Sequence, residues 1–442
     1  MPFPISHLFH FHGQPSLSEL DYILLIWKAI VLDVERCLVF MLQNPTGKER
    51  IALALLLGML AIMGPLNIDM YLPSFPDIAS DLNATASLVQ LSLTTCLIGL
   101  ATGQVIIGPI SDAVGRRKPL LIGITLFVFA SVLCALAPNI FILIAARFLQ
   151  GLTASAGVVL SRAVVRDVFT GRELTKFYAL LMVILAAAPM IAPMAGGAIL
   201  LLPFATWHTI FYFLSLLGML IVLTVFFRLE ETLPADKRLP SSIGNTVKTM
   251  GSLFKDRSFI GYAIIVGFVH GGSFAYVSGT PFVYQGIYGV SPQVFGILFG
   301  INGLAIMSGS WIVGRFGGIT HERNLLRIAV CIAASATAAI LLISVLEGPL
   351  ALMVIAIFIY MTTMGMTLTS SFSLAMEHQG HRAGSASAVL GLLPLLIGSI
   401  ASPLVGINES SAIPMGLILF ISSFIGFAAF FTLTKKPVKQ KS

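Results

Sequence analysis

Charged residues are scarce in this sequence. Lys, Arg, Asp and Glu make up 10% of its 442 residues, hydrophobic residues make up 57%, and the mean hydropathy is +0.95. A soluble globular domain usually carries about 25% charged residues. The composition therefore excludes an ordinary soluble enzyme, and it equally excludes a disordered or fibrous chain. An α-helical protein that crosses a membrane many times is the remaining class.

Cysteine is also rare, and no cysteine pair has the CxxC spacing. Cys96, Cys134 and Cys331 lie inside apolar runs, so they are interpreted as packing residues and neither as disulfides nor as metal ligands. A GxxxxGK[ST] nucleotide loop is missing as well. We therefore expect no catalytic residue, no metal site and no cofactor. The net charge of +7 is interpreted as membrane topology, not as nucleic-acid binding.

Long apolar runs recur along the chain with regular spacing. They are continuous, so helices are expected and barrel strands are not. The predicted spans are 51–72, 86–109, 118–137, 139–161, 174–202, 206–228, 258–281, 292–314, 324–346, 349–375, 382–405 and 411–433.

Lys and Arg occur in alternate connections between these spans. The connections without Lys or Arg are 73–85, 138, 203–205, 282–291, 347–348 and 406–410. Because cytoplasmic loops carry the excess of Lys and Arg, both ends of the bundle are expected in the cytoplasm of a cell-membrane protein. That topology requires an even number of spans, which agrees with twelve.

The domain organisation follows from the longest polar connection, 229–257, which is basic and contains prolines. It separates a six-helix half at 48–228 from another at 258–433, and a basic tail follows at 434–442. We expect a monomer in the lipid bilayer.

Residues 1–47 form an N-terminal extension that is apolar but interrupted by charges. An interfacial helix and a misassigned start, with translation beginning at Met41, both remain open. A thirteenth span is disfavoured because charges at the centre of a span are costly.

Most charged residues fall in loops or at the ends of predicted spans, and two lie clearly inside spans, Asp69 and Arg147. Counting residues from the span ends places both at similar depth, so a pair is expected, either direct or through water. Burial favours a protonated carboxyl group, and a nearby cation favours the ionised form. A cationic substrate that reached Asp69 would therefore expel its proton. A fixed ion pair that holds two spans together is the alternative.

A few other polar groups lie within the spans. His270 could carry a proton, although a buried neutral histidine is more common. Asn67, Tyr71, Gln150 and Asn302 could line a polar cavity, and hydrogen bonding between helices is the alternative for each.

The fifth span contains Pro189 and Pro193, followed by Gly196 and Gly197. The prolines remove backbone donors and kink a helix, whereas the glycines allow close helix approach. A span that bends or rocks is favoured over static packing.

Four segments resemble motifs of the major facilitator superfamily. Residues 108–118 resemble its signature between spans 2 and 3, with Ala113 where a basic residue is usual. RFLQG at 147–151 resembles its span 4 motif, and 187–197 resembles the antiporter signature, with Ala for the first Gly. NIDMYLP at 67–73 resembles the Bcr/CflA subfamily of bicyclomycin-resistance-like drug:proton antiporters.

The resemblance covers about residues 50–433 and implies an all-α, twelve-helix transporter that exports drug-like or other small molecules in exchange for protons by alternating access. It assigns proton and substrate coupling to Asp69 and Arg147. Its antiporter motif holds Pro189, Pro193, Gly196 and Gly197, and a cytoplasmic latch is implied at Gly108, Asp112, Gly115, Arg116 and Arg117.

Besides a channel, two alternative functions stay open. One is export of a natural metabolite such as an amino acid or a siderophore. The other is an integral membrane enzyme, for which His378 and His381 beside Glu377 are the only loop cluster to consider.

Overall fold

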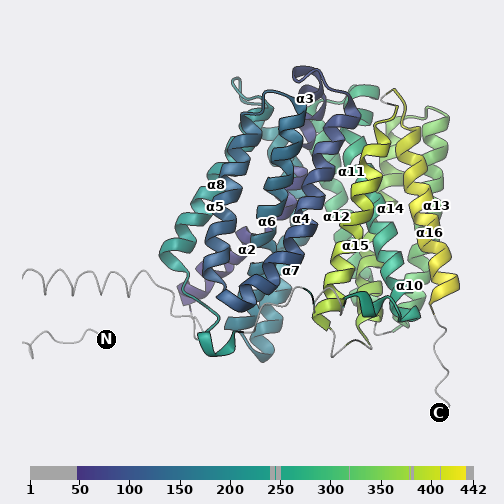
Figure 1. Ribbon diagram of the computed structural model, residues 1–442. Helices are drawn as coiled ribbons and strands as arrows, with labels where there is room; N and C mark the ends of the chain where they lie inside the picture. The colour runs from purple at the N-terminus through teal and green to yellow at the C-terminus, as the bar shows by residue number, and fades with distance from the viewer. Residues whose placement is uncertain are drawn as a thin grey trace, which may run out of the picture.

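The computed structural model describes residues 47–238, 244, 250–317, 319–377, 379, 383–408 and 410–434. All regular structure in these ranges is helical (Figure 1). Twelve helical stretches in this part of the chain are long and apolar enough to cross a membrane, which confirms the predicted number. The interpretations of residues 1–46, of 435–442 and of His378 and His381 lie outside the described residues.

The first six spans form one half of the molecule. They are α2 (Gly47–Asp69), α4 (Ala86–Val114), α5 (Arg117–Ala135), α6 (Ile140–Val168), α7 (Gly171–Ile199) and α8 (Trp207–Arg228). A 3₁₀ turn at Leu72–Ser74 and the short helix α3 (Phe75–Asp81) follow α2. Within this half, α6 lies at the centre and packs against α2, α4 and α5.

The last six spans form the second half, drawn in green and yellow in Figure 1. Its first span consists of α10 (Arg257–Ile265), a π-helical turn (Val266–His270), α11 (Gly271–Pro281) and a second π-helical turn (Phe282–Ile287). The others are α12 (Pro292–Phe316), α13 (Glu322–Val345), α14 (Leu350–Met376), α15 (Ala383–Val405) and α16 (Ile413–Leu433).

Polar caps define where several spans begin. The side-chain oxygens of Thr85, Asn139 and Ser291 each accept a backbone N–H in the first turn of α4, α6 and α12. Asp256 accepts two such N–H groups at the start of α10. A cap of this kind satisfies amide donors that have no partner within the helix.

Glycine permits the closest helix contact in the first half. A Cβ atom at Gly99 of α4 would overlap the backbone of α6 at Phe148, and one at Gly151 of α6 would overlap the backbone of α4 at Cys96. The two helices therefore touch backbone to backbone, so the side chains near this crossing are held at fixed depth.

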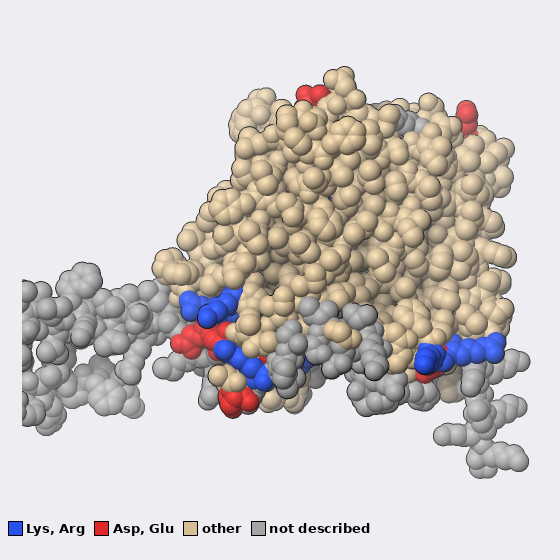
Figure 2. Space-filling view, in the orientation of Figure 1, with Lys and Arg blue, Asp and Glu red and all other residues tan. Residues whose placement is uncertain are grey.

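The Lys and Arg side chains gather at one end of the bundle, whereas Asp and Glu occur at both ends (Figure 2). We call the end with Lys and Arg the basic end and the opposite one the far end. Lys and Arg residues at or near the basic end include Arg50, Arg116, Arg117, Lys118, Arg162, Arg166, Lys176, Arg228, Arg238, Lys255, Arg257, Arg315, Arg323 and Arg327. The broad band above them in Figure 2 is almost free of charge, as a lipid-facing surface requires.

The two halves meet mainly where α4 packs on α15 and α7 packs on α12. At the far end they are in contact. Ser87 Oγ donates to the Pro403 carbonyl at 3.3 Å, and Gln90 Nε2 donates to the Ser278 carbonyl at 3.2 Å. Gln285 Nε2 donates to the carbonyl of Pro73 at 3.0 Å. The far end is therefore closed.

At the basic end the halves separate around a cavity of about 450 Å³, which we call the vestibule. Its walls come from α4, α6 and α7 in the first half and from α15 in the second. Along the boundary between the two halves, the far end is thus closed and the basic end contains the vestibule.

Candidate functional site

Asp69 is the last residue of α2, where the first span breaks before the 3₁₀ turn. The α-helix of the predicted span 51–72 therefore ends at Asp69, three residues before the predicted boundary. The side chain is buried, with 7% exposed, and lies within electrostatic range of Tyr276 in the other half. No hydrogen bond or ion pair to its carboxylate is found among the described residues. Asp69 is therefore a buried acid at the boundary between the two halves, and its carboxylate oxygens have no hydrogen-bond or ion-pair partner among the described residues.

Arg147 of α6 is completely buried and donates two hydrogen bonds to Asn67. Its Nη1 donates to Asn67 Oδ1 at 2.6 Å, and its Nη2 donates to the Asn67 carbonyl at 2.8 Å. These contacts confirm that Arg147 lies at the depth of the end of α2. Of the two forms of pair expected with Asp69, direct or through water, the direct one is not formed. Asn67 and Asp69 point about 200° apart on a helix, so only one can face α6.

Aromatic rings and neutral groups surround the Arg147 guanidinium. Its Cζ lies 4.1 Å from the Tyr71 ring centroid and 5.6 Å from that of Phe211. Nη1 also donates to Gln150 Oε1 at 2.5 Å. Cation–π contacts and carbonyl acceptors thus replace an acidic partner around this buried cation.

Two cysteines belong to the same polar network. Cys96 Sγ accepts from Asn67 Nδ2 at 3.1 Å, and Cys134 Sγ donates to Gln150 Oε1 at 3.4 Å. Gln150 Nε2 donates to Ser131 Oγ at 2.8 Å. The structure therefore brings together Asn67, Tyr71, Arg147 and Gln150 as one cluster. The two thiols are predicted only as packing residues, because nothing in the sequence distinguishes them from the apolar residues around them.

His270 and Asn302 lie in the other half of the molecule, away from this cluster. His270 ends the first π-helical turn, and its buried Nδ1 atom has no hydrogen-bond partner in the described part of the chain. Asn302 Nδ2 donates to the Tyr276 hydroxyl at 2.6 Å, and Tyr276 stacks on Phe299. Asn302 thus ties α12 to the Tyr276 side chain, which lies within electrostatic range of Asp69.

The segment predicted as a latch surrounds Arg116, which is 2% exposed. Its guanidinium donates to Asp112 Oδ1 at 2.6 Å and to Asp167 Oδ2 at 2.8 Å. Burial lowers the pKa of Arg116, but the hydrogen bonds to Asp167 and Asp112 outweigh burial, so its pKa is raised. Of the remaining latch residues, Gly108 has open space where a Cβ would lie.

Glu231, in the connection between the halves, completes this segment and was missed by the sequence reasoning. Its carboxylate accepts the backbone N–H of Arg116 at 2.7 Å and that of Arg117 at 3.2 Å. It therefore lies at the N-terminus of α5, where negative charge is stabilised. Gly115 has φ +101°, and a Cβ there would strike this carboxylate, so the turn requires glycine.

The predicted antiporter segment lies where α7 crosses two other elements. A Cβ at Gly196 would overlap the Met70 carbonyl next to Asp69, and one at Gly197 would lie 2.9 Å from the Pro292 carbonyl of α12. Both Pro189 and Pro193 lie inside α7. The segment therefore joins the broken end of α2 to the second half of the molecule.

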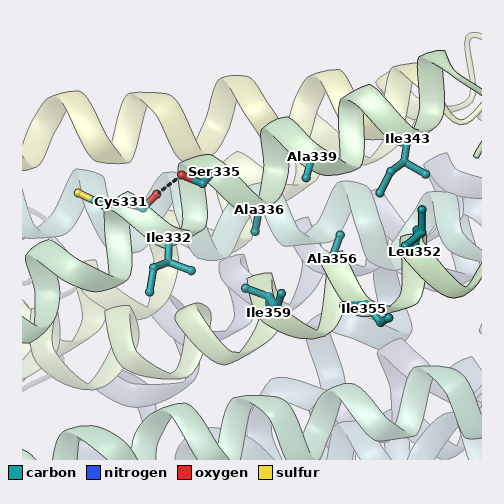
Figure 3. Close-up of a pocket in the computed structure, with 10 residues that line it drawn as sticks. All are labelled: Cys331, Ile332, Ser335, Ala336, Ala339, Ile343, Leu352, Ile355, Ala356 and Ile359. Carbon is teal, nitrogen blue, oxygen red and sulfur yellow. Dashed lines mark hydrogen bonds between the residues drawn. The ribbon is translucent and has the colours of Figure 1, made fainter.

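A second cavity, of about 490 Å³, lies between α13 and α14 (Figure 3). Its lining is aliphatic apart from Cys331 and Ser335, and the Ser335 hydroxyl donates to the Cys331 carbonyl at 3.1 Å. Ile332, Leu352 and Ile355 are exposed here, which is typical of a lipid-facing surface. The groove carries no charge and takes no part in the site.

A sequence model of the Major Facilitator Superfamily matches residues 57–403. The chain belongs to the major facilitator superfamily. It is 73% identical over 402 residues to the MFS-type transporter YdgK of Bacillus subtilis, covering 91% of this chain and 100% of that protein. It is 31% identical to a bicyclomycin resistance protein homolog of Haemophilus influenzae, covering 89% of this chain and 99% of that protein.

Solved structures agree on the fold of the superfamily. The D-xylose–proton symporter aligns with a TM-score of 0.69 at 14% identity, covering 87% of this chain and 97% of that one. The predicted twelve-helix fold and the resemblance to bicyclomycin-resistance-like proteins are confirmed. The protein is a multi-pass membrane transporter of the major facilitator superfamily.

Proposed function

We propose that this transporter exports drug-like or other small organic molecules in exchange for protons by alternating access. The basic end faces the cytoplasm, because cytoplasmic loops of membrane proteins carry the excess of Lys and Arg. Both ends of the bundle then lie on the cytoplasmic side of the cell membrane, and a monomer suffices for transport. No step of this scheme uses a cofactor or a covalent intermediate.

The free carboxyl group of Asp69 carries the proposal. An ionised carboxylate removed from water costs several kcal/mol unless it is paired. Arg147 does not neutralise it, since its guanidinium is bonded to Asn67 and Gln150. The site therefore holds either a proton or a substrate group that replaces it. This competition is the simplest exchange of a proton for a substrate.

Alternating access is supported by the asymmetry of the boundary between the halves. Polar side chains close the far end by bonding to backbone carbonyls, and no ion pair joins the halves there in the described residues. Bonds of this kind break at small net cost when water replaces them. The vestibule at the basic end would close when the far end opens, with the segment around Arg116 acting as the latch.

The substrate class rests on the relatives. Two relatives are named after drug resistance. One is the bicyclomycin resistance protein homolog, and the other is a chloramphenicol resistance protein of Pseudomonas aeruginosa, which is 30% identical to this chain over 363 residues. These names describe those proteins. They support drug export here, with export of a natural metabolite as the alternative. His378 and His381, on which the enzyme alternative rests, lie outside the described residues.

The test is efflux from an efflux-deficient host over a drug panel, followed by transport in proteoliposomes with an imposed pH gradient. Asp69→Asn should abolish gradient-driven export because its amide cannot release a proton. Asp77→Asn is the matched control, since Asp77 is an exposed acid of α3 nearby. Gradient-driven export that survives in folded Asp69→Asn protein would refute proton exchange at Asp69. A pH-driven metabolite flux without drug export would favour the alternative substrate.

A further inference from the structure

The walls of the vestibule carry an excess of positive charge. Asp112 and Arg116 line it together with Arg162 and Arg166, so three arginines face a single acid. No other acidic side chain lines the cavity among the described residues. A concave site with one sign of charge and low-dielectric walls concentrates ions of the opposite sign.

Only two of these arginines are available to a ligand. Arg116 is committed to Asp112, Asp167 and Ser111. Arg162 and Arg166 are exposed, and no hydrogen bond or ion pair of either guanidinium is found in the part of the chain that the structure describes. They are four residues apart on α6, so they project from the same face of the helix, one above the other.

The surrounding walls add neutral hydrogen-bonding groups and no competing anion. Ser385 and Ser387 of α15 line the side that belongs to the second half, and Gln104 of α4 lies on the first-half side. Hydroxyl and amide groups can donate to an anion. The cavity therefore offers two guanidinium forks together with neutral donors, in a volume typical of small-molecule sites.

We propose that the vestibule binds a carboxylate or phosphate group through Arg162 and Arg166. The planar guanidinium matches the two oxygens of either anion and binds them by parallel hydrogen bonds. Arg162 lies about 22 Å along α6 from Arg147, so this site is separate from the one at Asp69.

Two sources can supply such an anion. One is a free compound from the cytoplasm, which would make the vestibule the first contact of an exported molecule with an acidic group. The role as first contact of an exported molecule rests on the proposed export function, whereas anion binding by the vestibule does not. The other source is the headgroup of an anionic phospholipid from the adjacent leaflet, since the vestibule opens at the membrane surface.

The experiment measures thermal unfolding of the purified full-length protein without a proton gradient, so that its result is independent of transport. In one arm, inorganic phosphate or acetate replaces chloride at constant ionic strength, in nanodiscs of phosphatidylcholine. In the other arm, the nanodiscs contain phosphatidylglycerol. The double variant Arg162→Gln/Arg166→Gln is compared with Arg315→Gln/Arg327→Gln, which removes the same charge at the same end but outside the vestibule.

We expect phosphate to raise the unfolding midpoint of the wild type and of the control variant. In the vestibule variant, the shift in the midpoint should be at least tenfold smaller. Stabilisation by phosphatidylglycerol alone, lost only in the vestibule variant, would identify the lipid headgroup as the anion. Arg162→Lys/Arg166→Lys should keep part of the effect, and it replaces the glutamine variant if that does not fold. Equal responses of the vestibule and control variants, or no anion-specific effect on the wild type, would overturn the proposal.

Discussion

Replacing Gly406 by alanine should open the far end of the transporter. Gly406 follows α15, and a Cβ atom there would lie 2.6 Å from the backbone nitrogen and Cα of Ser87 and 2.6 Å from Gln90 Oε1. These atoms belong to the other half of the molecule. Backbone atoms of α4 cannot turn away as a flexible side chain would, so the added methyl group separates the two halves.

The size of the effect follows from the cost of overpacking. Inserting a methyl group into a well-packed contact costs about 1–3 kcal/mol. The clash exists only while the far end is closed, so the whole cost acts on the equilibrium between the two conformations. A difference of this size shifts such an equilibrium roughly 5- to 150-fold.

The assay is the labelling rate of single introduced cysteines by a membrane-impermeant maleimide, with the parent protein as the blank. Labelling of Ser387→Cys in the vestibule should fall in the Gly406→Ala protein, and labelling of Ser278→Cys at the far end should rise. Gly391→Ala is the control, because Gly391 lines the vestibule and a Cβ there meets nothing within 4 Å. Unchanged labelling at both cysteines would refute the reasoning.

Two further predictions concern carboxylates at the basic end. Glu231→Gln removes the charge that accepts the amides of Arg116, the N-cap of α5, and of Arg117. It should therefore lower the stability by about 1 kcal/mol, seen as a lower unfolding midpoint than in Glu230→Gln. Equal midpoints would contradict the capping role. The hydrogen bond from Lys176, with the nearby charge of Arg50, lowers the pKa of Glu173 below its usual 4.5. The stability that Glu173 contributes is therefore complete above pH 4.5 and is lost as the pH falls through the lowered value. The midpoint difference between wild type and Glu173→Gln should vanish in acid, and a difference that persists there would show that the charge is not responsible.

The twelve spans and their division into two halves could be predicted because hydrophobicity and the placement of Lys and Arg are local properties of the sequence. The depth argument also predicted that Arg147 lies beside the end of α2. It could not predict which residue Arg147 contacts, because that depends on the rotation of two helices about their axes. Asn67 faces Arg147, and Asp69 faces the boundary instead.

The role of Glu231 could not be predicted from local pattern, because its partners lie more than 100 residues earlier in the chain. The only signal is an acidic pair directly after a span, within an otherwise basic connection. The break in α2 at Asp69 was likewise hidden, since the residues on both sides of it are apolar. In each case the missing information is a contact between distant segments.

The π-helical turns in the seventh span have a consequence for how the halves communicate. Such a turn holds about one extra residue, so it rotates everything after it by roughly 100°. The segment before the first π-helical turn packs on α14 and α16, whereas the segment after it packs on α15 and α16 and also presents the carbonyl of Ser278 to Gln90 across the boundary. The span thereby packs on α14 before the turn, and after it on α15 and, through one face, on α4 of the opposing half. A uniform α-helix, however hydrophobic, would have to choose between those neighbours.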